Sequence, residues 1–126
     1  MRKITFAEAI NEAILTAMKE SKDVITYGLG VPDPKGVFGT TLGLRDEFGA
    51  ARVFDTPTSE NAMMGVGIGA AINGLRPIMV HQRVDFFLLA LDQLINNAAK
   101  WNFMFGGKSK VPITIRLIVG HGWGQG

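Results

Sequence analysis

The chain has 126 residues, enough for one domain with its own hydrophobic core, and its 47% hydrophobic and 19% charged residues exclude a generally disordered protein. No apolar run approaches the roughly 20 residues of a membrane span, and a net charge of +2 without a dense basic stripe argues against nucleic-acid partners. The absence of cysteine excludes disulfides and thiolate zinc sites, and we expect a cytoplasmic protein without membrane partners.

The first half of the chain is expected to alternate between helices and strands. Thr5 and Glu8 have the spacing of a capping box, and apolar residues then recur at helical intervals. A short apolar strand follows and ends in a loop that is rich in proline and glycine. The expected elements are helices over 5–20 and 41–48 and strands over 24–28 and 52–54.

The second half continues this alternation, which predicts an α/β fold with a parallel sheet and helices on both faces. Residues 1–126 contain no linker or repeat and are interpreted as a single domain. Residues 120–126 have glycine at every second position and look like a loop cut in the middle, so we expect the domain to be truncated at its C-terminal end. The remaining expected elements are helices over 60–73 and 87–101 and strands over 76–80 and 112–119.

Three alternate glycines, Gly65, Gly67 and Gly69, invite comparison with a dinucleotide-binding loop. That loop needs its glycines in the turn between a strand and a helix, whereas these lie inside a helix that begins near Glu60. Gly65, Gly69 and Asn73 are spaced four residues apart and form a smooth stripe on one helical face. Because each glycine weakens a helix by roughly 1 kcal/mol relative to alanine, we interpret the stripe as a helix–helix interface, including one between subunits.

Ligands of open parallel sheets bind outside the carboxyl ends of the strands, so side chains at that edge are candidates for a site. Glu60 begins a helix there, although the helix macrodipole alone favours an acid at such a position. His81 ends the third strand, where a lone histidine is more often a hydrogen-bonded structural group than a functional one. No Ser-His-acid order and no metal-ligand spacing is present. Residue types and spacing alone therefore predict a domain with a ligand-binding edge.

Five segments match a known family in one register: Asp55–Glu60, Gly65–Ile78, Asp92–Lys100, Gly106–Gly107 and Val111–Arg116. They resemble the beta subunit of the decarboxylating component of 2-oxo acid dehydrogenase complexes, such as the pyruvate dehydrogenase component. This thiamine-diphosphate-dependent family belongs to the transketolase-like superfamily. The resemblance extends from Thr5 to the glycine-rich tail, and it implies the fold of the superfamily's pyrimidine-binding domain.

The resemblance also implies roles for individual residues. Glu60 matches the glutamate that hydrogen-bonds a ring nitrogen of the cofactor's aminopyrimidine, which makes it both the catalytic and a cofactor-binding residue. A carboxyl group there favours the imino tautomer, whose exocyclic nitrogen can remove the thiazolium proton. Phe86 matches an aromatic residue that lies against the pyrimidine face, and a core position beside Phe87 is the alternative. Ile113 matches a position whose backbone carbonyl helps to hold potassium in some relatives.

Parts of the family's cofactor site are missing from this sequence. The Mg²⁺-binding Gly-Asp-Gly segment is absent, as is a phosphate loop with lysine. The resemblance therefore implies that an alpha subunit, in a heterotetramer, holds Mg²⁺ and the diphosphate, and that the glycine-striped helix mediates self-association. Leu29 and Gly30 stand where the family has an acidic pair, which puts a proton relay between paired active sites in doubt.

Other family features would lie beyond the last residue. The family's catalytic histidine would follow Gly126, and His121 is not that residue because relatives carry a small residue at its position. The family's second domain, which docks the lipoyl acyltransferase core, is absent from the sequence. We therefore expect the chain alone to be inactive, as a fragment or as one part of a split protein.

Three functions stay open at this point. The leading hypothesis is oxidative decarboxylation of a 2-oxo acid, with acyl transfer to lipoyl-lysine, by a complex that contains this domain. The second is one half of a split transketolase-like or deoxyxylulose-phosphate-synthase-like enzyme, although Asp55–Pro57 and the helix with Asp92 and Gln93 favour the dehydrogenase. The third is a non-catalytic oligomerisation module. The sequence does not identify the 2-oxo acid.

Overall fold

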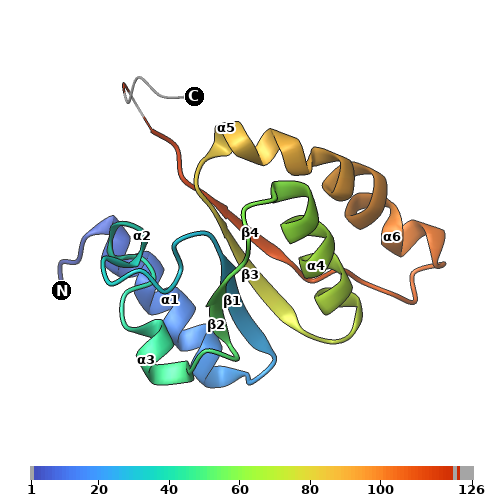
Figure 1. Ribbon diagram of the computed structural model, residues 1–126. Helices are drawn as coiled ribbons and strands as arrows, with labels where there is room; N and C mark the ends of the chain where they lie inside the picture. Colours follow the sequence, from blue (N-terminus) through green and yellow to red (C-terminus); the bar gives the residue numbers. More distant parts are fainter. Residues whose placement is uncertain (1, 121, 123–126) are drawn as a thin grey trace.

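A computed structural model, which describes residues 2–120 and 122, contains the predicted parallel sheet with helices on both faces (Figure 1). The strand order is β2-β1-β3-β4, and all three neighbouring pairs are parallel. The predictions for His121 and for the end of the glycine-rich tail lie outside the described residues. In chain order the elements are α1 (Phe6–Glu20), β1 (Val24–Gly28), α2 (Gly36–Gly39), α3 (Leu44–Phe48), β2 (Val53–Asp55), α4 (Glu60–Ile72), β3 (Arg76–His81), α5 (Val84–Phe87), η1 (Leu88–Ala90), η2 (Gln93–Ala98), α6 (Ala99–Met104) and β4 (Thr114–Leu117).

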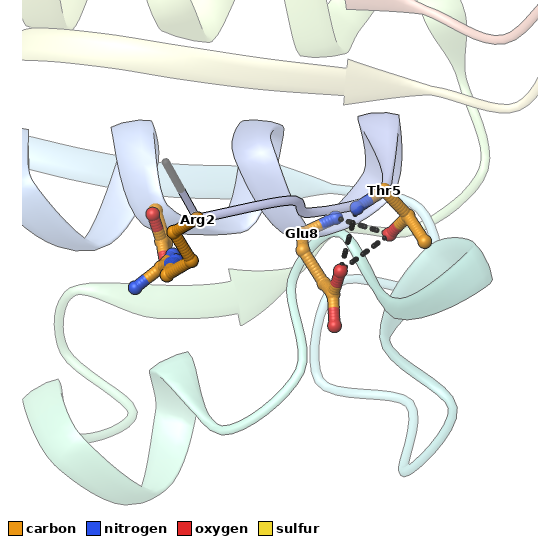
Figure 2. Close-up of polar contacts among 4 residues, drawn as sticks. Arg2, Thr5 and Glu8 are labelled. Atoms are coloured by element: carbon orange, nitrogen blue, oxygen red, sulfur yellow. Dashed lines mark hydrogen bonds and ion pairs between the residues drawn. The ribbon is translucent and has the colours of Figure 1, made fainter.

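The start of α1 is fixed by the predicted capping box, which Figure 2 shows. The Thr5 hydroxyl oxygen accepts a hydrogen bond from the Glu8 backbone N–H at 3.2 Å, and the Glu8 carboxylate accepts one from the Thr5 N–H at 2.7 Å. These bonds satisfy backbone donors that have no partner within the helix. The hydrogen bond from the Thr5 N–H is the main reason that the pKa of Glu8 lies below its usual value. Arg2 also pairs with Glu12 on the next turns.

The sheet separates two hydrophobic clusters, because successive side chains of a strand point to opposite faces. Helix α1 covers one face and α4 covers the other, as Figure 1 shows. The central strand β1 is buried along its whole length, since both of its faces are covered. The α1 side buries Ile14, Met18, Val24, Val31, Val37, Leu44, Val53, Val80 and Ile118, and the α4 side buries Ile25, Tyr27, Met63, Met64, Ile68, Met79, Phe87 and Ala90.

Arg52, just before β2, links three backbone segments on the α1 side. Its Nη2 atom donates to the carbonyl oxygens of Met18, Ser21 and Val24, each at 2.8 Å, and its Nε donates to Val24 at 3.1 Å. The guanidinium carbon also lies 5.0 Å from the centre of the Phe48 ring. The planar guanidinium can serve several acceptors at once, so Arg52 holds the end of α1 and the start of β1 against β2.

The predicted helix over 87–101 was wrong in its bounds and in its geometry. The helical segment begins at Val84 and continues to Met104, and it passes through a 3₁₀ turn (η1) and a π-helical turn (η2). In η2, the Gln93 side chain donates to Asn61 Oδ1 at 3.0 Å and accepts from Asn97 at 2.8 Å. The irregular turn thus accompanies a polar contact with the start of α4, which hydrophobic spacing along the chain does not report.

Two smaller predictions also need correction. The helix predicted over 41–48 begins only at Leu44, because the buried hydroxyl of Thr41 donates to the Val31 carbonyl oxygen at 3.0 Å and holds the preceding loop. That loop contains the short turn α2, in which Val37 and Phe38 have positive φ angles of 43° and 60°. The strand predicted over 112–119 is shortened to β4; Pro112, before its start, has no N–H to donate.

Candidate active site

The strand order places a topological switch point between β1 and β3. From β1 the chain passes through α2 and α3 to β2 on one side, and then through α4 to β3 on the other side. In open α/β sheets, the crevice at such a point, outside the carboxyl ends of the strands, is where ligands bind. Gly28, Asp55 and His81 end the three strands here, and Glu60 begins α4.

The strand ends are tied together through their backbones. Gly28 has a φ of +149°, and a Cβ atom there would lie 2.1 Å from the Val80 carbonyl oxygen, so no other residue fits. The Leu29 N–H donates to the same Val80 oxygen at 3.1 Å, and the Thr56 N–H donates to the Gly28 oxygen at 3.0 Å. The floor of the switch point is therefore made of closely spaced backbone.

Asp55 holds the loop after β1, a role that the sequence analysis did not assign to it. Its two carboxylate oxygens accept the backbone N–H groups of Gly30 at 3.0 Å and Val31 at 2.8 Å. From the other side, the Gln82 amide donates to the Leu29 carbonyl oxygen at 3.1 Å. In the sequence, the only indication of this role is that Asp55 is an acidic residue at the end of a strand. Its partners lie about 25 positions earlier, and local spacing does not identify them.

Glu60 lies where the sequence predicts it, as the first residue of α4, and its side chain is half-buried. Its charge acts on His81, which ends β3. The fold thus places an acid and an imidazole from different elements, 21 positions apart in the chain, at the same carboxyl edge of the sheet. An acid at a helix N-terminus is also favoured by the macrodipole, so position alone does not define its role.

His81 is fully buried, and neither ring nitrogen has a hydrogen-bond partner within the described part of the chain. The prediction of a hydrogen-bonded structural histidine is therefore wrong. The Phe87 ring packs edge-on against the imidazole, with 5.1 Å between ring centres. Burial lowers the pKa of His81, and the Glu60 carboxylate opposes that shift with a smaller effect. The imidazole is accordingly neutral at pH 7.

Phe86 and Phe87, which are neighbours in α5, have different environments. Phe87 belongs to the buried cluster on the α4 side, whereas Phe86 is 41% exposed. The guanidinium carbon of Arg83 lies 5.2 Å from the centre of the Phe86 ring. The interpretation of Phe86 as a core residue is thus not supported by its exposure, and its ring remains accessible at the edge where β3 ends.

Ile113 does not join this group of residues. It precedes β4, so it lies at the amino edge of the parallel sheet, opposite to Glu60. Its Cδ1 atom instead packs close to Gly67 on α4. Among the residues that the structure describes, no cluster of histidine, cysteine or acidic side chains has a metal-binding arrangement.

The glycines of α4 have three different environments. A Cβ atom on Gly67 would lie 2.2 Å from the Tyr27 hydroxyl oxygen, so this glycine is required by packing inside the chain. A Cβ atom on Gly65 would meet Gln93 of η2 at an ordinary 3.7 Å. A Cβ atom on Gly69 would have no described atom within 4 Å, and Asn73 donates to the Gly69 carbonyl oxygen at 2.8 Å. The tightest contact thus falls on a glycine outside the predicted stripe.

A hollow of about 290 Å³ opens beside the switch point. The hollow is lined by Gly30, Asp33, Lys35, Val37, Phe38 and Gln82. Glu60 is not among these lining residues.

Within the described ranges, we find no helix with the length and apolar character needed to cross a membrane.

The fold and the site define a doubly wound parallel α/β domain whose candidate site lies at the β1/β3 switch point. The chain belongs to the family of transketolase pyrimidine-binding domains, which matches residues 2–125. This match confirms the predicted fold class, and together with relatives at about 40% identity it confirms the predicted resemblance.

Curated relatives are about 40% identical to the chain. The pyruvate dehydrogenase E1 component subunit beta of Rhizobium meliloti (strain 1021) is 43% identical over 116 residues, which cover 92% of this chain and 25% of that protein. The acetoin:2,6-dichlorophenolindophenol oxidoreductase subunit beta of Bacillus subtilis (strain 168) is 42% identical, with 97% and 39% covered. The pyruvate dehydrogenase E1 component subunit beta of Staphylococcus aureus is 39% identical, with 97% and 38% covered. The chain thus spans between a quarter and two-fifths of their length.

Proposed function

We propose that the chain forms the pyrimidine-binding half of a thiamine diphosphate site in a decarboxylating component of a 2-oxo acid dehydrogenase complex. The observation that carries this proposal is the half-buried carboxyl group of Glu60 at the carboxyl edge of the sheet. Glu60 lies in the Asp55–Glu60 segment that resembles the family's cofactor-binding segment. The relatives at about 40% identity, which are named as dehydrogenase and oxidoreductase beta subunits, support the same assignment.

The residues at the switch point suit a nitrogen heterocycle. Glu60 offers a carboxyl oxygen that can hold a proton shared with a ring nitrogen, and Phe86 offers a partly exposed aromatic face for stacking. The neutral His81 adds buried polar atoms that lack partners in the described chain. When bound, thiamine diphosphate supplies an electron sink for cleavage of a bond next to a carbonyl group. The chain's own contribution is to orient the heterocycle and to hold a proton at Glu60.

The same proposal assigns the rest of the site to partner chains. An alpha subunit holds Mg²⁺ and the diphosphate, in a heterotetramer, and a lipoyl acyltransferase core accepts the acyl group. Within the predicted stripe of α4, Gly69 has open surroundings in the described chain and is proposed to contact a second copy. The Ile113 carbonyl is the candidate potassium ligand, at the opposite edge of the sheet. The 126-residue chain alone is inactive on this proposal.

The proposal is tested by replacing Glu60 with Gln in the protein assembled with its alpha subunit. Thiamine diphosphate affinity should fall, and turnover of a 2-oxo acid should fall about 100-fold or more, because Gln cannot hold the shared proton. Glu20→Gln, an exposed change at the far end of α1, is the matched control. If Glu60→Gln binds thiamine diphosphate and turns over like wild type, the assignment is wrong.

Acetoin is a second candidate substrate. The Bacillus subtilis relative is named for acetoin, and its identity of 42% is almost that of the pyruvate dehydrogenase relative at 43%. Both substrates present a carbonyl carbon next to the bond that is broken. Steady-state rates with pyruvate and with acetoin in the same assembled protein separate the two functions, and wild-type turnover of acetoin alone would replace the dehydrogenase assignment.

A further inference from the structure

In the fold itself, an apolar residue could take the place of the buried His81 side chain. It lies on the same face of β3 as Met79 and packs with the apolar cluster on the α4 side. A buried polar group without a hydrogen bond costs about 1–3 kcal/mol. Both nitrogens of His81 are in this state within the described residues. Such a group in a native fold indicates a partner that the isolated chain does not supply in this arrangement.

Of the charged groups near His81, Glu60 is the one whose charge affects the imidazole. The other charged groups are engaged elsewhere. Arg83 and Asp85, at the start of α5, interact with each other at 3.8 Å. Asp55 at the end of β2 is occupied by two backbone N–H groups. Arg116 of β4 pairs in register with Val80 and lies on the α1 side of the sheet, together with Ile10 and Ile14.

Tyr27 of β1 is the remaining titratable side chain on the same face of the sheet. Its hydroxyl donates to the Met63 carbonyl oxygen at 2.8 Å, and burial raises the pKa of this phenol, so it stays neutral. Of these groups, the Glu60 carboxylate is the one whose charge affects the imidazole. Glu60 comes from α4, at the mouth of the same edge.

We propose that His81 is a positioning residue for Glu60, and that the imidazole and the carboxyl group exchange a hydrogen bond, directly or through one water molecule, in the assembled site. This inference rests on the proposed function, because it gives Glu60 the cofactor-binding role. A neutral imidazole has one donor and one acceptor nitrogen. His81 donates to the ionised carboxylate of Glu60 or accepts from the protonated one, so it holds the carboxyl group in one orientation through either state.

The first test follows the titration of His81 by nitrogen NMR in the intact protein without thiamine diphosphate. His81 and His121 are the two histidines of this sequence, and a His81→Gln variant assigns the signal. Glu60→Gln should lower the pKa of His81 further, because it removes the negative charge that opposes the effect of burial. Glu20→Gln should leave that pKa unchanged. An unchanged His81 titration in Glu60→Gln overturns the proposal.

The second test measures thiamine diphosphate affinity across pH in the assembled protein. His81→Leu should weaken binding about tenfold, the equivalent of one hydrogen bond, and alter its pH dependence, whereas His81→Gln should stay within about threefold of wild type. If His81 only filled space in the core, His81→Gln would weaken thiamine diphosphate binding more than His81→Leu, because Leu keeps the apolar packing and Gln does not. Equal affinities and pH profiles in all three proteins overturn the proposal.

Failure of the proposed function has a different signature. In that case, wild type itself does not bind thiamine diphosphate, while the His81 titration still responds to Glu60→Gln. If wild type binds thiamine diphosphate and Glu60→Gln weakens that binding, but both His81 variants match wild type, then the cofactor assignment stands and the positioning role of His81 is wrong.

Discussion

Replacing Gly67 with Ala tests the tightest contact of the α4 side. The new Cβ atom would lie 2.2 Å from the Tyr27 hydroxyl oxygen and 2.8 Å from Ile113 Cδ1. Tyr27 is fully buried, and its hydroxyl donates to the Met63 carbonyl oxygen at 2.8 Å, so it cannot move without breaking that bond. The substitution therefore either shifts α4 away from the sheet or displaces the phenol.

The expected change in the free energy of unfolding combines two destabilising effects and one stabilising effect. Overpacking a well-filled core costs about 1–3 kcal/mol, and a buried hydrogen bond left unsatisfied costs about 1–3 kcal/mol. Replacing a helical glycine with alanine returns about 1 kcal/mol. The free energy of unfolding of Gly67→Ala should therefore fall by about 1–5 kcal/mol. Gly69→Ala, at an open position of the same helix, should raise it by up to about 1 kcal/mol.

Urea unfolding of the two variants decides between these outcomes by sign. A Tyr27→Phe background adds a second check, because it removes the oxygen that the new methyl group meets. Gly67→Ala should then destabilise the protein less than it does in wild type, although the Ile113 contact remains. If Gly67→Ala is as stable as wild type, or if both glycine variants shift stability in the same direction, the packing argument is refuted.

Three further predictions concern residues of the frame around the site. Asp55→Ala should release the Gly30 and Val31 N–H groups, so their hydrogen exchange should accelerate; unchanged exchange would contradict the clamp. Arg52→Lys should lower the free energy of unfolding by about 1–3 kcal/mol, because an ammonium group cannot replace the forked guanidinium donors, and equal stability would contradict this. Because burial lowers the pKa of folded His81 below its ordinary 6.5, the unfolded chain takes up that proton first. Stability is then full above pH 6.5 and falls as the pH is lowered through the folded-state pKa, and His81→Leu should flatten this fall in thermal unfolding from pH 7 to 5.

The elements that local signals specify were predicted well. The capping box of Thr5 and Glu8 uses partners three positions apart, and the helix that follows ends at the predicted Glu20. Glu60 was placed correctly at the start of α4 because strand-to-helix transitions have their own local pattern. The helix after β3 was predicted less well. A π-helical turn changes which residues share a face, and a constant period of 3.6 residues cannot represent that change.

Features that depend on distant partners could not be predicted. Gly67 is required by the hydroxyl of Tyr27, which is forty positions earlier, and glycine spacing favoured its neighbours instead. Arg52 donates hydrogen bonds to carbonyl oxygens between Met18 and Val24, and the residues next to Arg52 in the sequence do not indicate these partners. The missing partners of His81 became visible only with the packing around it, because a sequence does not show whether a polar atom is satisfied.

The way in which Asp55 holds the loop after β1 has a consequence for how this edge can change. The clamp uses backbone N–H groups of Gly30 and Val31, so it places no demand on the side chains of the neighbouring residues. Pro32 and Lys35 can then be exchanged while the strand ends keep their arrangement, whereas the Asp33 carboxylate is needed to accept the Lys35 backbone N–H at 2.7 Å. Substitutions at such positions, by design or in evolution, therefore change the lining of the adjacent hollow without changing the arrangement of the strand ends.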